Sequence, residues 1–107
     1  MSKQITFTFE DKDYTLEYTR RTVRQMEESG FVAREIDNKP MTLLPQLFAG
    51  AFLAHHKYIK QEVIERIYNA MPNKEDLIGA LAEMYNDPIV TLMDEPTEGN
   101  VEWTPSW

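Results

Sequence analysis

The chain has 107 residues, which is enough for one ordinary domain and too few for two. Eighteen acidic residues against eleven basic ones give a formal net charge of −7. This balance argues against a general nucleic-acid-binding protein, because phosphate contacts need clustered positive charge. The absence of cysteine excludes disulfides, thiolate nucleophiles and cysteine-based metal sites. Since 42% of the residues are hydrophobic, the chain can fill a core and we do not expect disorder.

Neither the N-terminus nor any internal stretch predicts contact with a membrane. The first residues are polar and lead directly into a strand pattern, unlike a signal peptide. The longest uncharged stretch, residues 41–54, is too short to span a bilayer. We therefore expect a cytoplasmic protein.

Two stretches near the N-terminus alternate apolar and polar residues with the period of a β-strand. The apolar positions are Ile5, Phe7 and Phe9 in the first stretch and Tyr14, Leu16 and Tyr18 in the second. With residues 10–13 as the connection, the pattern predicts a β-hairpin that has one apolar face. Two strands alone are marginally stable in water, so we expect helices, or strands of another chain, to cover that face.

A short helix is predicted over residues 20–29, with Thr19 as its N-cap. Gly30 follows as a helix stop, and Phe31 stands where such a stop often makes an apolar contact. Residues 31–40 read as a connector with one helical turn around residues 33–36, broken at Pro40.

The strongest helical pattern covers residues 42–58, with Thr42 as a candidate cap and Pro45 in the first turn. The small residues within it are Ala49, Gly50, Ala51 and Ala54. Either this is the central helix of the core, or its small residues form an interface that another backbone approaches closely.

Residues 61–71 form the next amphipathic pattern, which ends at Pro72. Another helix is predicted to start after Asn73 as its N-cap, to break at residues 86–88, and to be followed by a short turn of helix over residues 89–93. The predicted fold class is therefore α+β: an N-terminal β-hairpin followed by four or five helices in a single domain, residues 1–93.

Residues 94–107 differ in composition from the rest of the chain. They hold four acids and no base, with a charge of −4, and we expect an extended acidic tail. The tail also holds Val101, Trp103 and Trp107. It is either a frayed end whose tryptophans rest on the nearest apolar surface, or a strand that adds to the edge of the hairpin in its own or another chain.

No residue pattern points to catalysis. His55 and His56 are adjacent, so on a helix they point about 100° apart and cannot chelate one ion as an i, i+4 pair would. The serines are Ser2, Ser29 and Ser106, and none lies in a nucleophile elbow. The four scattered glycines form no phosphate-binding loop. We predict a protein that is not an enzyme and that has no cofactor and no metal.

One basic cluster, formed by Arg20, Arg21 and Arg24, lies near the start of the first helix. Arg20 and Arg24 are four residues apart and share a helix face. That face is either simply solvated or a docking site for an acidic segment, for which the chain's own tail is the nearest candidate. The predicted partner-binding residues are therefore Arg20, Arg24, Val101, Trp103 and Trp107.

Several stretches together carry a resemblance to a known family. The hairpin reads ITFTF and YTLEY, residues 20–31 read R-x-T-V-x-Q-M-E-x-x-G-F, and residues 40–52 read P-M-T-L-L-P-x-L-F-A-G-A-F. HHK follows at residues 55–57 and MYNDPI at residues 84–89. Over residues 4–93 the chain resembles an uncharacterised family of small phage and prophage proteins of Gram-positive bacteria. It is similar in size and layout to the tail-assembly chaperones of long-tailed phages.

That resemblance implies a non-enzymatic protein that binds the tape-measure protein during tail assembly and is absent from the finished virion. It also implies self-association, so a homo-oligomer is expected, and no catalytic residue is carried over. Two other functions remain open at this point: a structural head–tail or tail component, and a small acidic regulatory protein that binds a basic site on its target.

Overall fold

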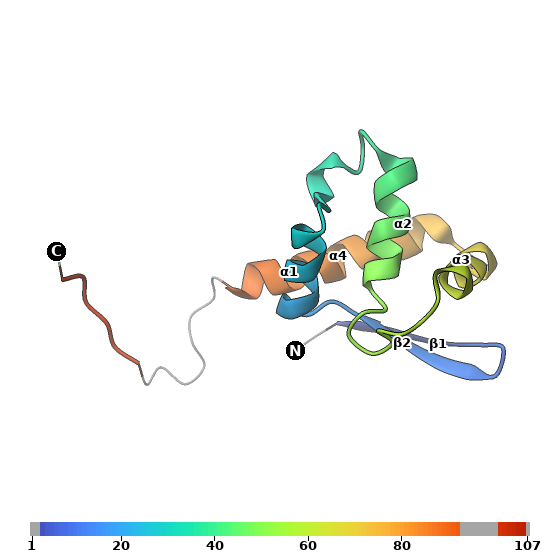
Figure 1. The fold of residues 1–107 in the computed structure, drawn as a ribbon, viewed down its shortest axis with the longest axis horizontal. Helices are drawn as coiled ribbons and strands as arrows, with labels where there is room; N and C mark the ends of the chain where they lie inside the picture. Colours follow the sequence, from blue (N-terminus) through green and yellow to red (C-terminus); the bar gives the residue numbers. More distant parts are fainter. Residues whose placement is uncertain (1–2, 93–100, 107) are drawn as a thin grey trace.

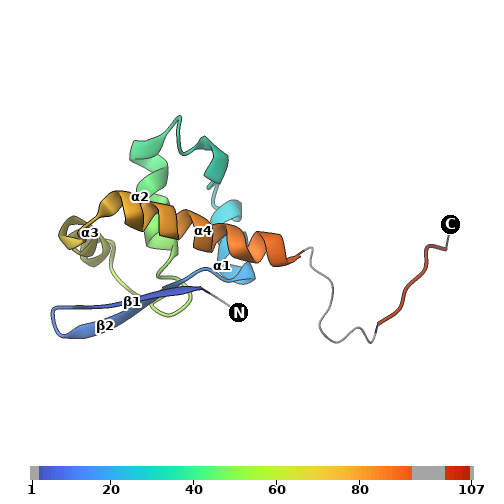
Figure 2. The same cartoon turned by 180° about the vertical axis from the view of Figure 1, so that it is seen from behind.

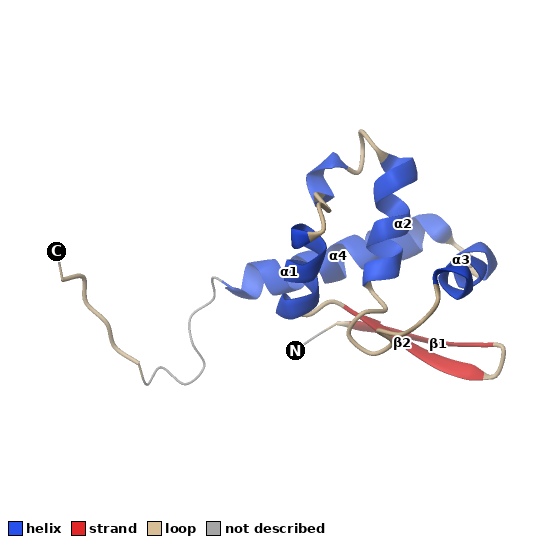
Figure 3. Ribbon diagram, viewed as in Figure 1, coloured by secondary structure: helices blue, strands red, loops and turns tan. Residues whose placement is uncertain are grey.

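A computed structural model describes residues 3–92 and 101–106 of the chain. The fold is α+β, as predicted: an antiparallel hairpin comes first and is followed, within these residues, by four α-helices. The helices lie together on one side of the hairpin (Figures 1 and 3). In chain order the elements are β1 (Gln4–Phe9), β2 (Lys12–Glu17), α1 (Arg20–Glu28), the 3₁₀ turn η1 (Ala33–Glu35), α2 (Pro40–Gly50), α3 (Gln61–Ala70) and α4 (Lys74–Leu92).

The hairpin turn is shorter than the expected connection over residues 10–13. Only Glu10 and Asp11 lie outside the strands, and Lys12 and Asp13 already belong to β2. Both turn residues have positive φ, 50° and 64°. A two-residue turn of this kind has the twist of the flanking strands, which explains why the chain turns so tightly without a glycine.

The apolar face of the hairpin packs against the helices, as expected. The register pairs Ile5 with Leu16 and Phe7 with Tyr14. The rings of Phe7 and Tyr14 stack with centroids 5.4 Å apart. Tyr14 and Leu16 are buried, whereas Thr6 and Thr8 on the opposite face are exposed.

Helix α1 has the predicted ends. The Thr19 side chain accepts a hydrogen bond from the amide of Thr22, and the Thr22 side chain accepts one from the amide of Thr19, which makes a capping box. At the other end Gly30 has a φ of 101°, a conformation that favours glycine. The amide of Phe31 then donates to the carbonyl of Met26 at 3.0 Å, and the Phe31 ring is buried.

Helix α2 differs from the predicted helix over residues 42–58 at both ends. It begins at Pro40, where the missing amide hydrogen costs nothing and the fixed φ suits a first helical residue. Thr42 therefore lies inside the helix and is not its cap. The helix ends at Gly50, because the amides of Ala51, Phe52 and Leu53 each bond to a carbonyl three residues back and tighten the chain into turns.

Helix α4 continues through the predicted break at residues 86–88 and includes residues 89–92 of the short helix expected over 89–93, while Met93 lies outside the described residues. Pro88 is a helix breaker by local propensity, but here it is buried with Tyr85 beside α1. Nη2 of Arg20 also donates to the carbonyl of Thr91 at 2.8 Å and holds the last turn. Asn73 precedes the helix as predicted, with a φ of 53°, and its carbonyl accepts from the amide of Leu77.

Helix α2 occupies the centre of the helical layer, between α1, α3 and α4. Helix α4 crosses α2 on the far side in Figure 1 and is seen in front of it in Figure 2. The side chains that are almost completely buried come from several elements and include Leu16, Leu47, Phe48, Phe52, Ile67 and Leu81. A Cβ atom on Gly50 would lie 2.4 Å from Sδ of Met26. Gly50 and the fully buried Ala51 therefore face the protein core, which supports the first interpretation of the small residues.

Two glycine substitutions test this packing in opposite directions. Gly50→Val inserts methyl groups against Met26 and is expected to lower the free energy of unfolding by about 1–3 kcal/mol. A Cβ atom on Gly79 of α4 would meet no atom within 4 Å. Gly79→Ala is therefore expected to raise the free energy of unfolding by about 0.5–1 kcal/mol, because alanine loses less backbone entropy on folding. Urea denaturation measures both. A Gly50→Val variant as stable as the wild type would mean that the flexible end of the Met26 side chain moves aside without cost.

Candidate functional site

Arg20 and Arg24 lie together on a hollow between two helices. Their side chains line a groove of about 390 Å³, here called the α1–α4 groove. The other residues that line it are Val23, Glu27, Pro88, Ile89 and Leu92. The sequence placed the two arginines on one face of α1, and the structure adds the apolar face of α4 beside them.

The two arginines are engaged to different degrees. Arg20 donates to the carbonyl of Thr91 and so fastens the end of α4 to α1. Nε of Arg24 lies 4.0 Å from Oε1 of Glu28, and its side chain is 80% exposed, so this pair contributes little to stability. Next to Arg24, Ile89 and Leu92 are 40% and 63% exposed. The groove therefore offers a charged guanidinium and apolar surface side by side.

Val101 and Trp103, two of the predicted partner-binding residues of the tail, do not line this groove. Val101 and Trp103 are 80% and 78% exposed. Residues 101–106 have no regular secondary structure and do not pair with the hairpin, whose sheet has two strands in the described part of the chain. Trp107 lies outside the described residues, as do Asp94, Glu95 and Glu98.

The hairpin edge, the other expected binding surface, is partly used within the chain. The amide of Thr15 donates to Nε2 of His56 at 3.1 Å, and the amide of Glu17 donates to the carbonyl of Ala51 at 3.0 Å. These amides belong to the outer edge of β2. A strand from a partner would therefore have to add to β1.

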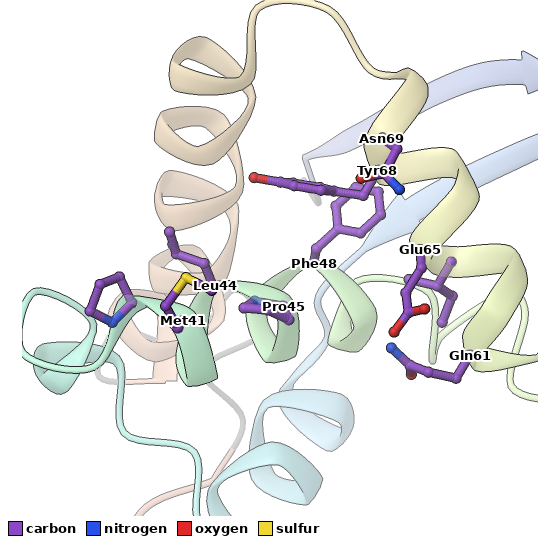
Figure 4. Close-up of a pocket in the computed structure, with 10 residues that line it drawn as sticks. Met41, Leu44, Pro45, Phe48, Gln61, Glu65, Tyr68 and Asn69 are labelled. Atoms are coloured by element: carbon purple, nitrogen blue, oxygen red, sulfur yellow. The ribbon is translucent and has the colours of Figure 1, made fainter.

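A second groove, which the sequence did not single out, lies between α2 and α3 (Figure 4). Its volume is about 370 Å³, and we call it the α2–α3 groove. Helix α2 contributes Pro40, Met41, Leu44, Pro45 and Phe48, and helix α3 contributes Gln61, Ile64, Glu65, Tyr68 and Asn69. Sequence periodicity shows that each helix has an apolar face, but not that these two faces meet.

The α2–α3 groove has an apolar floor and one large exposed apolar side chain at its rim. The rings of Phe48 and Tyr68 pack edge to face with centroids 5.1 Å apart. Met41 is 90% exposed, although it lies on the helix face that leads to Phe48. Glu65 and Gln61 supply polar atoms on the α3 side (Figure 4). A flexible thioether at an apolar groove adapts readily to a partner surface.

A third cluster joins the hairpin to the turn after α2. Oε1 of Glu17 lies 2.7 Å from Nε2 of His55 and accepts a hydrogen bond from Nε2 of Gln4 at 3.0 Å. The Glu17 side chain is only 10% exposed. This buried carboxylate could not be predicted from the sequence, because Glu17 occupies an ordinary polar position of a strand and His55 is 38 residues away. The cluster holds two segments together.

His56 completes that connection in its neutral form, because Nε2 accepts the hydrogen bond from Thr15. Its pKa is lowered from the ordinary value of 6.5, first by burial and then by the positive charges of Lys12 and His55. The two histidines thus lie just beyond the end of α2 and bond to β2. Their role here is structural.

No group of three or more His, Asp or Glu side chains is arranged to hold a metal ion among residues 3–92 and 101–106. Within the same ranges, no helix combines the length and the apolar character that crossing a membrane requires.

Comparison with known proteins gives one match. The whole chain, residues 1–107, matches the family described as a domain of unknown function, DUF5055. The chain belongs to the DUF5055 family. No curated protein and no solved structure matches it.

The hydrogen bond from Thr15 to His56 predicts a pH-dependent contribution to stability. At pH 7.5, His56→Ala should lower the free energy of unfolding by about 1 kcal/mol, the usual net value of one hydrogen bond. Because the folded-state pKa is lowered, the unfolded chain binds the proton more readily. The stabilisation by the Thr15–His56 hydrogen bond is therefore complete above about pH 6.5. It is lost as the pH falls toward the lowered pKa that His56 has in the folded state.

The measurement is urea denaturation of wild type and His56→Ala at pH 7.5 and pH 5.0. The stability gap between them should shrink at the lower pH. The exposed Tyr58→Ala serves as a control whose gap should not change, since Tyr58 is 87% exposed. An equal gap for His56→Ala at both pH values would contradict the assigned role of the neutral imidazole.

Proposed function

We propose that this protein binds an apolar helical segment of another protein in the α2–α3 groove, and that it does so without catalysis. The observation that supports the proposal most directly is the exposed, apolar face that α2 presents to this groove. Met41, Leu44, Pro45 and Phe48 follow one another at spacings of three, one and three residues, which places them on one side of the helix.

Helix α3 supports the same binding mode from the other wall. Ile64 and Tyr68 are four residues apart and line the groove opposite α2. Together the two helices line an apolar hollow that can receive the apolar side chains of a partner helix. Insertion of an amphipathic helix into an apolar groove is a common way in which proteins recognise partner segments.

We further propose that the partner is a phage tape-measure protein and that the protein acts as a tail-assembly chaperone in the host-cell cytoplasm. This identity rests on the resemblance over residues 4–93 described above. The chemistry of the groove agrees with it, because a long helical partner exposes apolar faces that need protection before assembly. The net charge of −7 would keep the complex dispersed.

A matched pair of substitutions tests the groove. Met41→Glu puts a charge at the rim of the α2–α3 groove and should weaken capture of the tape-measure protein by about tenfold or more, since a buried methionine contributes about 1.5–3 kcal/mol. Tyr58→Glu introduces the same charge at an equally exposed position that does not line the groove, and capture should be unchanged. The measurement is affinity capture of co-expressed tape-measure protein with tagged variants.

Two outcomes would count against the proposal. If the wild-type protein does not enrich the tape-measure protein, the proposed partner is wrong. If Met41→Glu captures as much of it as the wild type does, the α2–α3 groove is not the binding site. Mass spectrometry of purified virions provides a separate check. A chaperone should be missing from virions, whereas a structural tail component should be present.

A further inference from the structure

The α1–α4 groove and the acidic tail have complementary chemistry. Helix α1 contributes Arg20, Arg24 and Glu27 to the lining of the groove, so two positive charges stand against one negative charge, and helix α4 contributes Ile89 and Leu92. Residues 94–107 contain four carboxylates and no base. A segment that offers negative charge together with large apolar side chains fits a groove that offers positive charge beside apolar surface.

Both surfaces are left in water when they are apart. Leu92 is 63% exposed in the groove, and Val101 and Trp103 are 80% and 78% exposed in the tail. Val101 and Trp103 are two residues apart, so in an extended chain they point to the same side. Docking would remove all three side chains from water at once, which is favourable in proportion to the apolar area covered.

The tail starts next to the groove. Leu92, at the end of α4, is one of the residues that line the groove. Arg20, which also lines it, donates a hydrogen bond to the carbonyl of Thr91. Eight residues separate Leu92 from Val101. Eight residues can reach at most about 29 Å, which is more than the length of one or two turns of α4. Such a short connection gives an effective concentration in the millimolar range, well above usual protein concentrations.

We propose that residues 101–106 dock in cis on the α1–α4 groove, with Val101 and Trp103 on Ile89 and Leu92. Within this segment the carboxylate is that of Glu102, and the other three acids of the tail add negative charge that Arg20 and Arg24 attract. The docked form is a second state of the chain, in addition to the one in which Trp103 is exposed. The groove lies on a different pair of helices from the α2–α3 groove, so this inference does not depend on the proposed function.

Tryptophan fluorescence tests the inference directly, because Trp103 and Trp107 are the only two tryptophans of the chain. Acrylamide quenching of the full-length protein at low salt is compared with that of a synthetic peptide of residues 94–107. Wild-type tryptophans should be less accessible than those of the peptide. Accessibility should rise toward the peptide value in 1 M salt, where charges are screened beyond about 3 Å.

Two matched pairs of variants locate the docking site. Arg24→Glu should shift the docking equilibrium toward the free tail by about two- to fivefold, the effect expected of an exposed ion pair. Arg21→Glu makes the same charge change on α1 outside the groove and should leave quenching unchanged. Leu92→Asp should free the tail, whereas Val90→Asp, exposed but outside the groove, should not.

Three results would overturn the inference. The first is wild-type quenching equal to that of the peptide. The second is equal effects of Arg24→Glu and Arg21→Glu, which would indicate general charge attraction and not this groove. The third is protection that increases with protein concentration, which would indicate that the tail of one copy binds another copy. Circular dichroism of each variant checks that the helices remain folded.

Discussion

The hydroxyl of Tyr18 and the amide of Glu17 donate hydrogen bonds to the carbonyls of Leu47 and Ala51 at the end of α2. Those carbonyls stand where the helix no longer supplies its own amides, so the hairpin satisfies them instead. In return, the hairpin gains the helical cover without which two strands are marginal in water. The burial of Tyr18 raises the pKa of its hydroxyl, which keeps it protonated as a donor.

Both grooves follow from this arrangement. Because α2 stops at Gly50, residues 51–60 turn past β2 and bring α3 alongside α2, which forms the α2–α3 groove. Helix α1 emerges directly from β2 and packs on the second half of α4, which forms the α1–α4 groove. The two surfaces differ in chemistry, since the first is mainly apolar and the second carries Arg20 and Arg24. They can therefore serve different ligands on one small domain.

Elements whose signals are local could be predicted from the sequence. The hairpin was visible as a period-two pattern, and α1 was visible with its ends because Thr19 and Gly30 act on their nearest neighbours. The end of α2 and the continuity of α4 could not be predicted in the same way. The end of α2 depends on the hydrogen bond from Tyr18 and on the contact with β2. Helix α4 stays continuous because the packing of Pro88 beside α1 outweighs the free-energy cost of a proline inside a helix. The pairing of Glu17 could not be predicted for the same reason, since its partner His55 is distant in the sequence.

The sequence by itself determined the α+β class, the pair of arginines on one face of α1 and the separation of charge between body and tail. Each of these depends on composition or on spacing within a few residues. Only the tertiary structure decided which helix faces meet, and hence that Met41 and Tyr68 share one groove while Arg24 and Leu92 share another. The physical reason is that periodicity fixes the direction of a side chain relative to its own helix axis, whereas the neighbour that it meets depends on packing of the whole chain.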